Sequence, residues 1–115
     1  WNLWNEDWIT RKDSHYTIGC IHTTQGYDMN YVGVIFGKEI DYDPVSNSIV
    51  IDLNEYRDKK VKAGMGGAEL KKLIINTYTT ILARGIKGCY VYACNKNLQN
   101  YLRKFIAAAN DYTLK

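Results

Sequence analysis

Residues 22–28 form the segment with the most side chains that could do chemistry. The segment lies between two short apolar runs and offers hydroxyls, an amide, a carboxylate and an imidazole. It also contains a glycine, which has no side chain to cover its backbone N–H. Such groups suit contacts to phosphate and sugar oxygens, and α/β folds bind ligands in loops at the carboxyl ends of parallel strands. On residue types alone, a polar connecting loop is the simpler interpretation. The residues in question are His22, Thr23, Thr24, Gln25, Gly26 and Asp28.

A second candidate is Arg84, at the end of an amphipathic stretch and just before Gly85. A guanidinium grips phosphate oxygens with planar donors and offsets charge during phosphoryl transfer. A cation at a helix C-terminus also stabilises the helix by about 0.3 to 1 kcal/mol, and both roles can hold together. A phosphate cradle is missing, because "GVIFGKE" has three residues between its glycines and does not match G-x-x-x-x-G-K-[ST]. We therefore expect no ATP hydrolysis by this chain alone.

The elements that must position these residues can be inferred from periodicity. Apolar, β-branched runs predict strands buried on both faces, alternation around a turn predicts a hairpin, and apolar spacings of three and four predict helices. The order favours an α/β layer with a mostly parallel sheet. We expect strands at 17–21, 31–36 and 89–94, a hairpin at 38–43 and 49–52, a mobile glycine-rich loop at 53–67, and helices at 68–84 and 98–109, the second capped by Asn95 or Asn97.

Charge is unevenly distributed along the 115 residues, whose formal net charge is +3. Residues 1–58 carry 4 Lys/Arg and 10 Asp/Glu, giving −6, whereas residues 59–115 carry 11 and 2, giving +9. A polyanion would therefore be met mainly by the second half. Two solvated faces of opposite charge are the alternative.

Composition indicates which classes of protein this chain does and does not fit. An apolar content of 46% fits one globular domain over residues 1–115. No apolar run approaches the ~18 residues of a membrane span, so no membrane partner is expected. Three cysteines without a CxxC pair favour a reducing cytoplasm, and with the two histidines they fit no zinc pattern, so no metal site is expected. Because the chain begins at Trp1 within a Trp-rich run, we expect it to be a piece of a longer protein.

Two segments together resemble motifs of superfamily 1 helicases. "IGCIHTTQGYDMNYVGVIFG" resembles motif V, which has an apolar strand, His, two small or polar residues, Gln or Lys, Gly, an acid and a second strand. "NTYTTILARGIKGCYVY" resembles motif VI, in which a helix ends in Arg and is followed by a strand. The two are in the usual order, and with the preceding Trp-containing stretch they are most similar to the bacterial Schlafen group 3 DNA/RNA helicase domain family.

This resemblance implies a RecA-like carboxyl-terminal lobe of the P-loop NTPase type, with an inserted hairpin. Arg84 would be an arginine finger that reaches ATP and Mg²⁺ held mainly by an amino-terminal P-loop lobe of the same polypeptide. The resemblance places Gln25, Gly26 and Asp28 near the nucleotide, and His22 and Thr23 on single-stranded DNA or RNA. The longer protein would be a helicase-like ATP hydrolase, and the chain by itself inactive.

Two departures from the family pattern keep an alternative open. Ala83 stands where most superfamily 1 helicases have Thr, and Asp28 stands where Glu is more usual. The alternative is a nucleic-acid or protein-binding module without catalysis that retains the fold. A nuclease is a third possibility, suggested by "DKK" and "ELK".

Two further groups of residues have a functional and a structural interpretation. Trp1, Trp4 and Trp8 could stack on bases or belong to the core. Glu39, Asp41 and Asp43 share one strand face and could hold a metal, although a solvated hairpin face is commoner.

Overall fold

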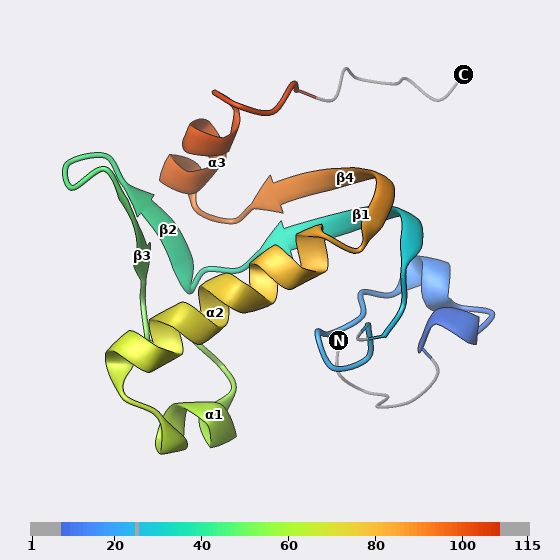
Figure 1. Ribbon diagram of the computed structural model, residues 1–115, viewed down its shortest axis with the longest axis horizontal. Coiled ribbons are helices and arrows are strands. Elements are labelled where there is room, and N and C mark those ends of the chain that lie inside the picture. Colours follow the sequence, from blue (N-terminus) through green and yellow to red (C-terminus); the bar gives the residue numbers. More distant parts are fainter. Residues whose placement is uncertain (1–7, 25, 109–115) are drawn as a thin grey trace. The chain divides into compact units, whose positions relative to one another are not determined.

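The structure is a computed structural model that describes residues 8–24 and 26–108 (Figure 1). The chain folds into two compact units, Trp1–Val34 with Leu73–Tyr90 and Ile35–Lys72 with Val91–Lys115. Within the described residues no helix is long and apolar enough to cross a membrane. The elements are η1 (Trp8–Thr10), η2 (Ser14–Tyr16), β1 (Met29–Phe36), β2 (Ile40–Asp43), β3 (Ser48–Ile51), α1 (Lys59–Gly64), α2 (Gly67–Leu82), β4 (Gly85–Ala93) and α3 (Lys96–Leu102).

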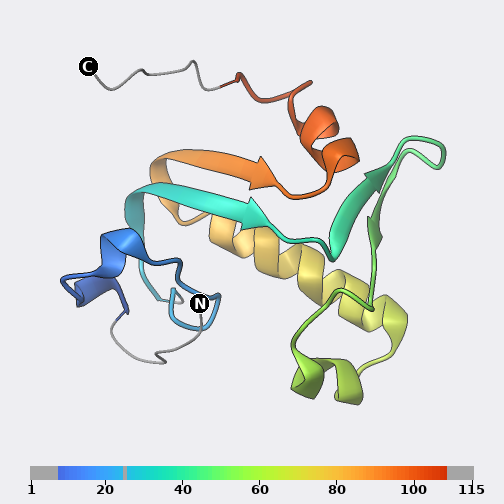
Figure 2. The same cartoon turned by 180° about the vertical axis from the view of Figure 1, so that it is seen from behind.

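Strands β1 and β4 form a parallel pair, which confirms the α/β class. The Met29 N–H donates to the Arg84 carbonyl at 2.9 Å, and the Cys94 N–H donates to the Phe36 carbonyl at 3.0 Å, so both strands advance together. Their arrows point the same way in both views (Figures 1 and 2). Among the described residues this sheet has two strands, a smaller sheet than the one that a RecA-like lobe would contain.

One face of β1 is buried and the other is open. Val32, Val34 and Phe36 are buried, whereas the alternate residues Tyr31 and Ile35 are exposed. The expectation of burial on both faces is therefore wrong. The reason is that successive side chains point to opposite faces, and in the part of the chain that the structure describes only one of these faces is covered.

The strand predicted at residues 17–21 is wrong. Residues 18–20 are irregular and residues 21–23 form a turn. Ile18 is 61% exposed, and the carbonyl of Cys20 accepts the N–H groups of Thr23 and Thr24 at 3.1 and 3.2 Å. An isolated extended segment has no ladder partner, so these local bonds decide the backbone conformation.

The predicted hairpin is confirmed as β2 and β3, paired antiparallel with Ile40 opposite Ile51 and Asp43 opposite Ser48. Its turn is closed by the Asp43 carboxylate, which accepts the Ser46 hydroxyl at 2.6 Å and the Val45 N–H at 2.9 Å. These donors, the Ser46 hydroxyl first, hold the pKa of Asp43 below its ordinary value.

The long loop predicted before α2 contains a short helix, α1. Asp58 supports its start, because the Asp58 carboxylate accepts the Val61 N–H at 3.2 Å and the Asp58 carbonyl accepts the Lys62 N–H at 3.0 Å. Lys62 also donates its Nζ to the Leu53 carbonyl at 2.7 Å. Capping by a short acidic side chain thus orders part of a glycine-rich segment that composition alone makes look mobile.

The helix predicted at 68–84 is confirmed as α2, in which Leu70 and Ile74 are almost fully buried at 1% and 2% exposure. The last helix is shorter than predicted and ends at Leu102. Asn95 stands at the N-cap position, as predicted, but its side chain makes no capping hydrogen bond, because its amide donates to the carbonyls of Lys38 and Ile40 at 3.0 and 2.8 Å.

The cap of α3 comes from the hairpin. Asp41 Oδ1 accepts the Leu98 N–H at 3.0 Å, one of the donors that a helix start leaves without an intrahelical partner. Leu98 is 2% exposed, and the Tyr42 ring stacks on Tyr101 with centroids 4.1 Å apart. The apolar contacts between the hairpin and α3 therefore form a core in the unit that contains Ile35–Lys72 and Val91–Lys115.

Candidate functional site

Asp28 and Arg84 meet at the point where the two parallel strands begin. Each residue directly precedes a strand, and the Met29 to Arg84 backbone bond aligns the two strand starts. Arg84 Nη1 donates to Asp28 Oδ1 at 3.1 Å, with side-chain exposures of 32% and 65%. The structure thus brings together, across 56 positions of sequence, one residue from each of the two segments that resemble motifs V and VI.

This location differs from the expected edge of the sheet. Residues 22–28 precede β1 instead of following a strand, because residues 17–21 are not one. The candidate site therefore lies at the amino ends of β1 and β4, and the expectation that residues 22–28 follow the carboxyl end of a strand is wrong.

Hydroxyl side chains of the loop are used by a local turn. Thr23 Oγ1 donates to the Cys20 carbonyl at 2.9 Å, and Thr24 Oγ1 lies 3.2 Å from the same oxygen. Thr23 is 8% exposed, whereas its neighbour His22 is exposed. Thr23 thus has an internal partner, and contact with nucleic acid stays a prediction for both residues.

Gly26 has a backbone conformation that favours glycine. Its φ is +83°, in the left-handed region where a Cβ introduces strain. A Cβ there would meet no atom within 4 Å, so the requirement comes from the backbone and not from crowding. Gln25 lies outside the described residues. The glycine that the resemblance assigns to motif V consequently has a structural reason, which is its left-handed backbone conformation ahead of β1.

A shallow pocket of about 180 Å³ lies between this loop and the second half of α2. Ligand pockets usually measure about 300 to 1,000 Å³, so this one can take only part of a nucleotide. The spacing of Asn76 and Thr80 could have indicated the polar side of the pocket, because the two lie four residues apart on one face of α2; Arg84 lies beyond the end of this helix at Leu82. The lining residues are Ile21, Thr24, Leu73, Asn76, Thr77, Thr80, Ile81 and Arg84.

Gly85 lets the backbone pass close behind Arg84. A Cβ on Gly85 would lie 2.9 Å from Val32 Cγ1 and closer still to the Gly88 carbonyl oxygen. No larger residue fits without displacing backbone. Gly85, which follows Arg84 in the segment that resembles motif VI, is therefore required for packing.

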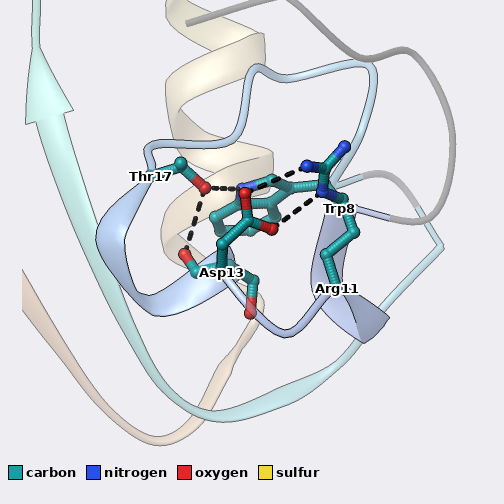
Figure 3. A network of polar contacts seen from close by, with 5 residues as sticks. Trp8, Arg11, Asp13 and Thr17 are labelled. Carbon is teal, nitrogen blue, oxygen red and sulfur yellow. Dashed lines mark hydrogen bonds and ion pairs between the residues drawn. The ribbon is translucent and has the colours of Figure 1, made fainter.

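Trp8 belongs to a polar network with Thr17 and Ser14 (Figure 3). Its Nε1 donates to Thr17 Oγ1 at 2.7 Å, and Thr17 Oγ1 donates to the Ser14 carbonyl at 3.2 Å. A Cβ on Gly19 would lie 2.6 Å from the indole, which therefore packs on that glycine. Trp8 is half-buried, so these contacts give it structural partners without placing it in the core, while Trp1 and Trp4 lie outside the described residues.

Arg11 and Asp13 complete the view in Figure 3 with a two-bond ion pair at 2.9 and 3.0 Å. The hydrogen bonds from Arg11 hold the pKa of Asp13 below its ordinary value.

The acidic residues of the hairpin do not gather into a metal site. Asp41 caps α3, and Asp43 closes the hairpin turn. Among the described residues no three His, Cys, Asp or Glu side chains come close enough to hold a metal ion. The structure thus gives these carboxylates architectural partners.

Two comparisons with known proteins identify the family. The family model for the Schlafen group 3 DNA/RNA helicase domain matches residues 1–95. The chain belongs to this family. An uncharacterized protein of Saccharomyces cerevisiae, YPL245W, is 36% identical over 100 residues, which are 83% of this chain and 22% of the yeast protein. The chain thus spans about a fifth of the length of that relative. No solved structure matches.

Proposed function

We propose that this Schlafen group 3 chain is the second RecA-like lobe of a nucleic-acid-dependent, helicase-like ATPase. The observation that carries the proposal is the meeting of the motif V loop and the motif VI arginine. Thr24 and Arg84 line one pocket, and Asp28 pairs with Arg84. A site for one nucleotide needs both segments within reach of the same ligand.

Arg84 would act as an arginine finger toward ATP held by a P-loop lobe elsewhere in the polypeptide. Its guanidinium is partly exposed and sits between a helix end and a strand start, so it can face a second lobe. ATP would supply the phosphoryl group, and Mg²⁺ would offset its negative charge. The P-loop lobe would make most of the contacts to ATP and Mg²⁺. Gln25 and Gly26 would lie beside the nucleotide, where the pocket is too small to enclose it.

Single-stranded DNA or RNA is the proposed partner of the lobe. His22 is exposed next to the Thr23 turn and would contact the strand directly, with Thr23 shaping the backbone that carries it. The +9 half of the sequence would add sequence-independent attraction to phosphates.

Turnover in the longer protein tests the role of Arg84. Arg84→Ala should lower kcat by about 10³-fold or more, the lower range for an arginine finger. Arg84→Lys should retain ATP binding and lose most turnover, because an ammonium cannot make the forked contact. Lys87→Ala is the matched control, since Lys87 is also cationic and exposed but lies outside the pocket. Undiminished turnover in Arg84→Ala would refute the proposal.

Salt dependence tests the nucleic-acid role. Binding of a labelled single strand should weaken steeply between low and physiological salt. Lys71→Ala should reduce the salt slope, whereas His22→Ala should weaken binding and leave the slope nearly unaltered. Binding that does not depend on salt would show that the basic half is only a solvated face.

A module without catalysis is the second candidate, favoured by Ala83 at the usual Thr position. It predicts nucleic-acid or protein binding by the longer protein and the same ATP turnover in the wild type and in Arg84→Ala. The Arg84 series therefore separates the two functions.

A further inference from the structure

We infer that Asp28 is a positioning residue that aims Arg84 at the nucleotide phosphates, and that it acts on the arginine and not on the nucleotide sugar. The inference rests on the proposed function, because it assigns Asp28 a task only if Arg84 serves ATP. It departs from the position near the nucleotide that the motif V resemblance implies for this acid.

Backbone geometry sets the two side chains beside each other. The Met29 N–H bonds to the Arg84 carbonyl at 2.9 Å, and Asp28 is the residue just before Met29. Asp28 and Arg84 are consequently held at adjacent strand starts by the sheet itself, and a salt bridge of 3.1 Å closes between them. A pair anchored in this way needs little further ordering of the backbone to form.

The form of the contact leaves Arg84 able to bind a phosphate. The ion pair joins one guanidinium nitrogen, Nη1, to one carboxylate oxygen, Oδ1. A guanidinium carries five N–H donors in a planar fork, so a single contact fixes its direction without using up its donors. Within the part of the chain that the structure describes, Asp28 is the acid paired with Arg84. Arg84 also lines the pocket, so its anchored side chain lies where the ligand would approach.

Holding the arginine before ATP arrives should help the chemical step more than it helps binding. A long flexible side chain loses rotamer freedom when it engages a phosphate, and an anchored one has already lost much of it. Misplacement of a catalytic group by about 1 Å can lower the rate by about 10²-fold. Because Asp28 itself is 65% exposed, its hold on Arg84 is weaker than that of a buried partner. We therefore expect Asp28 to raise the rate about tenfold.

Steady-state kinetics of the longer protein test the inference. Asp28→Asn removes the charge and keeps the shape, and it should lower kcat about tenfold while KM for ATP stays within about twofold. Asp28→Glu should recover part of the rate, because a carboxylate is restored with one added methylene. The double variant Asp28→Asn with Arg84→Ala should be no slower than Arg84→Ala alone, since a residue that acts through another adds nothing once that other is gone.

Nucleotide analogues separate positioning of Arg84 by Asp28 from direct binding of the sugar by Asp28. If Asp28 bound the sugar, Asp28→Asn would raise KM and abolish the preference for ATP over analogues lacking a ribose hydroxyl. An unchanged preference supports the inference, and a lost preference overturns it. Additive effects in the double variant would also overturn it.

The two proposals fail in different ways. Full turnover in Arg84→Ala, or no turnover in the wild type, would refute the proposed function and this inference with it. Loss of turnover in Arg84→Ala together with wild-type kinetics in Asp28→Asn would refute the inference alone. In the 115-residue chain, NMR signals of the Arg84 guanidinium should change in Asp28→Asn, and unchanged signals would show that the pair does not form in solution.

Discussion

Gly85→Ala should destabilise the chain strongly, although it adds a single methyl group next to the candidate site. The new Cβ would lie 2.9 Å from Val32 Cγ1 and closer to the Gly88 carbonyl oxygen. The Val32 methyl can move by a few tenths of an ångström, but the carbonyl belongs to β4 itself. Relief therefore requires a shift of the strand that follows Arg84.

Gly85→Ala should lower the free energy of unfolding by about 3 kcal/mol, the upper end of the range for overpacking, because backbone blocks the added methyl. An unfolding entropy of about 2.1 cal/mol/K per residue makes 1 kcal/mol equivalent to about 4 °C for a chain of this length. The melting temperature should therefore fall by about 12 °C.

Two glycines of the same paired strands provide a graded control. A Cβ on Gly33 would meet nothing within 4 Å, so Gly33→Ala should be neutral or stabilising by up to about 1 kcal/mol. A Cβ on Gly88 would lie 3.3 Å from the Tyr31 ring, which can tilt, so Gly88→Ala should lose about 1 kcal/mol. Urea and thermal unfolding followed by circular dichroism would measure all three variants. Equal stability of Gly85→Ala and Gly33→Ala would refute the packing argument.

Three further predictions concern residues around the site and in the hairpin. Trp8→Phe should lose about 1 kcal/mol in urea unfolding, because the Nε1 bond to Thr17 disappears while most ring packing on Gly19 remains; unchanged stability would contradict that bond. Thr23→Val should also lose about 1 kcal/mol, and Thr23→Ser less, because only the serine keeps a hydroxyl for the Cys20 carbonyl; if the two variants are equally stable, the hydroxyl does not matter. The carboxyl of Asp43 should titrate by NMR below the ordinary value of about 3.9. Since its folded-state pKa is lowered, its stabilising effect is present above that value and is lost as the pH falls through the folded pKa; removing the hydroxyl by Ser46→Ala should raise the midpoint, and an unmoved midpoint would exclude Ser46 as the main cause.

Elements with a strong local pattern could be predicted from the sequence. Helix α2 has apolar residues at three and four and a glycine after Arg84, and the hairpin has alternating residues around a clear break. Both rest on contacts between residues close in sequence, which periodicity reports directly.

Elements that depend on distant partners could not be predicted in the same way. Residues 17–21 have the composition of a strand, but a strand needs a ladder partner, and composition does not show whether one is in reach. The open face of β1 has the same origin, since Tyr31 and Ile35 are as apolar as the buried residues between them.

The candidate site was predictable only in part. Motif order indicated Arg84 and the loop at 22–28, and the roles of these residues stay predictions. The pairing of Asp28 with Arg84 follows from both residues standing just before parallel strands, which requires knowing that β1 and β4 are neighbours. The spacing of Asn76 and Thr80 on one face of α2 was a signal present in the sequence, but it was weak without the pocket that they line together with Arg84.

The cap that Asp41 provides for α3 shows that the folded unit extends past the end of the family match. The family match ends at residue 95, immediately before this seven-residue helix. A helix shorter than about 12 residues is marginal alone, and α3 depends on acceptors in the hairpin that are 55 to 57 positions away. A chain shortened to residue 95 would keep every shared motif and still leave Tyr42 without its stacking partner and the Ala93 N–H without the Gln99 side chain that accepts it. Residues outside the matched region therefore complete the contacts of Asp41 and Tyr42 in the hairpin.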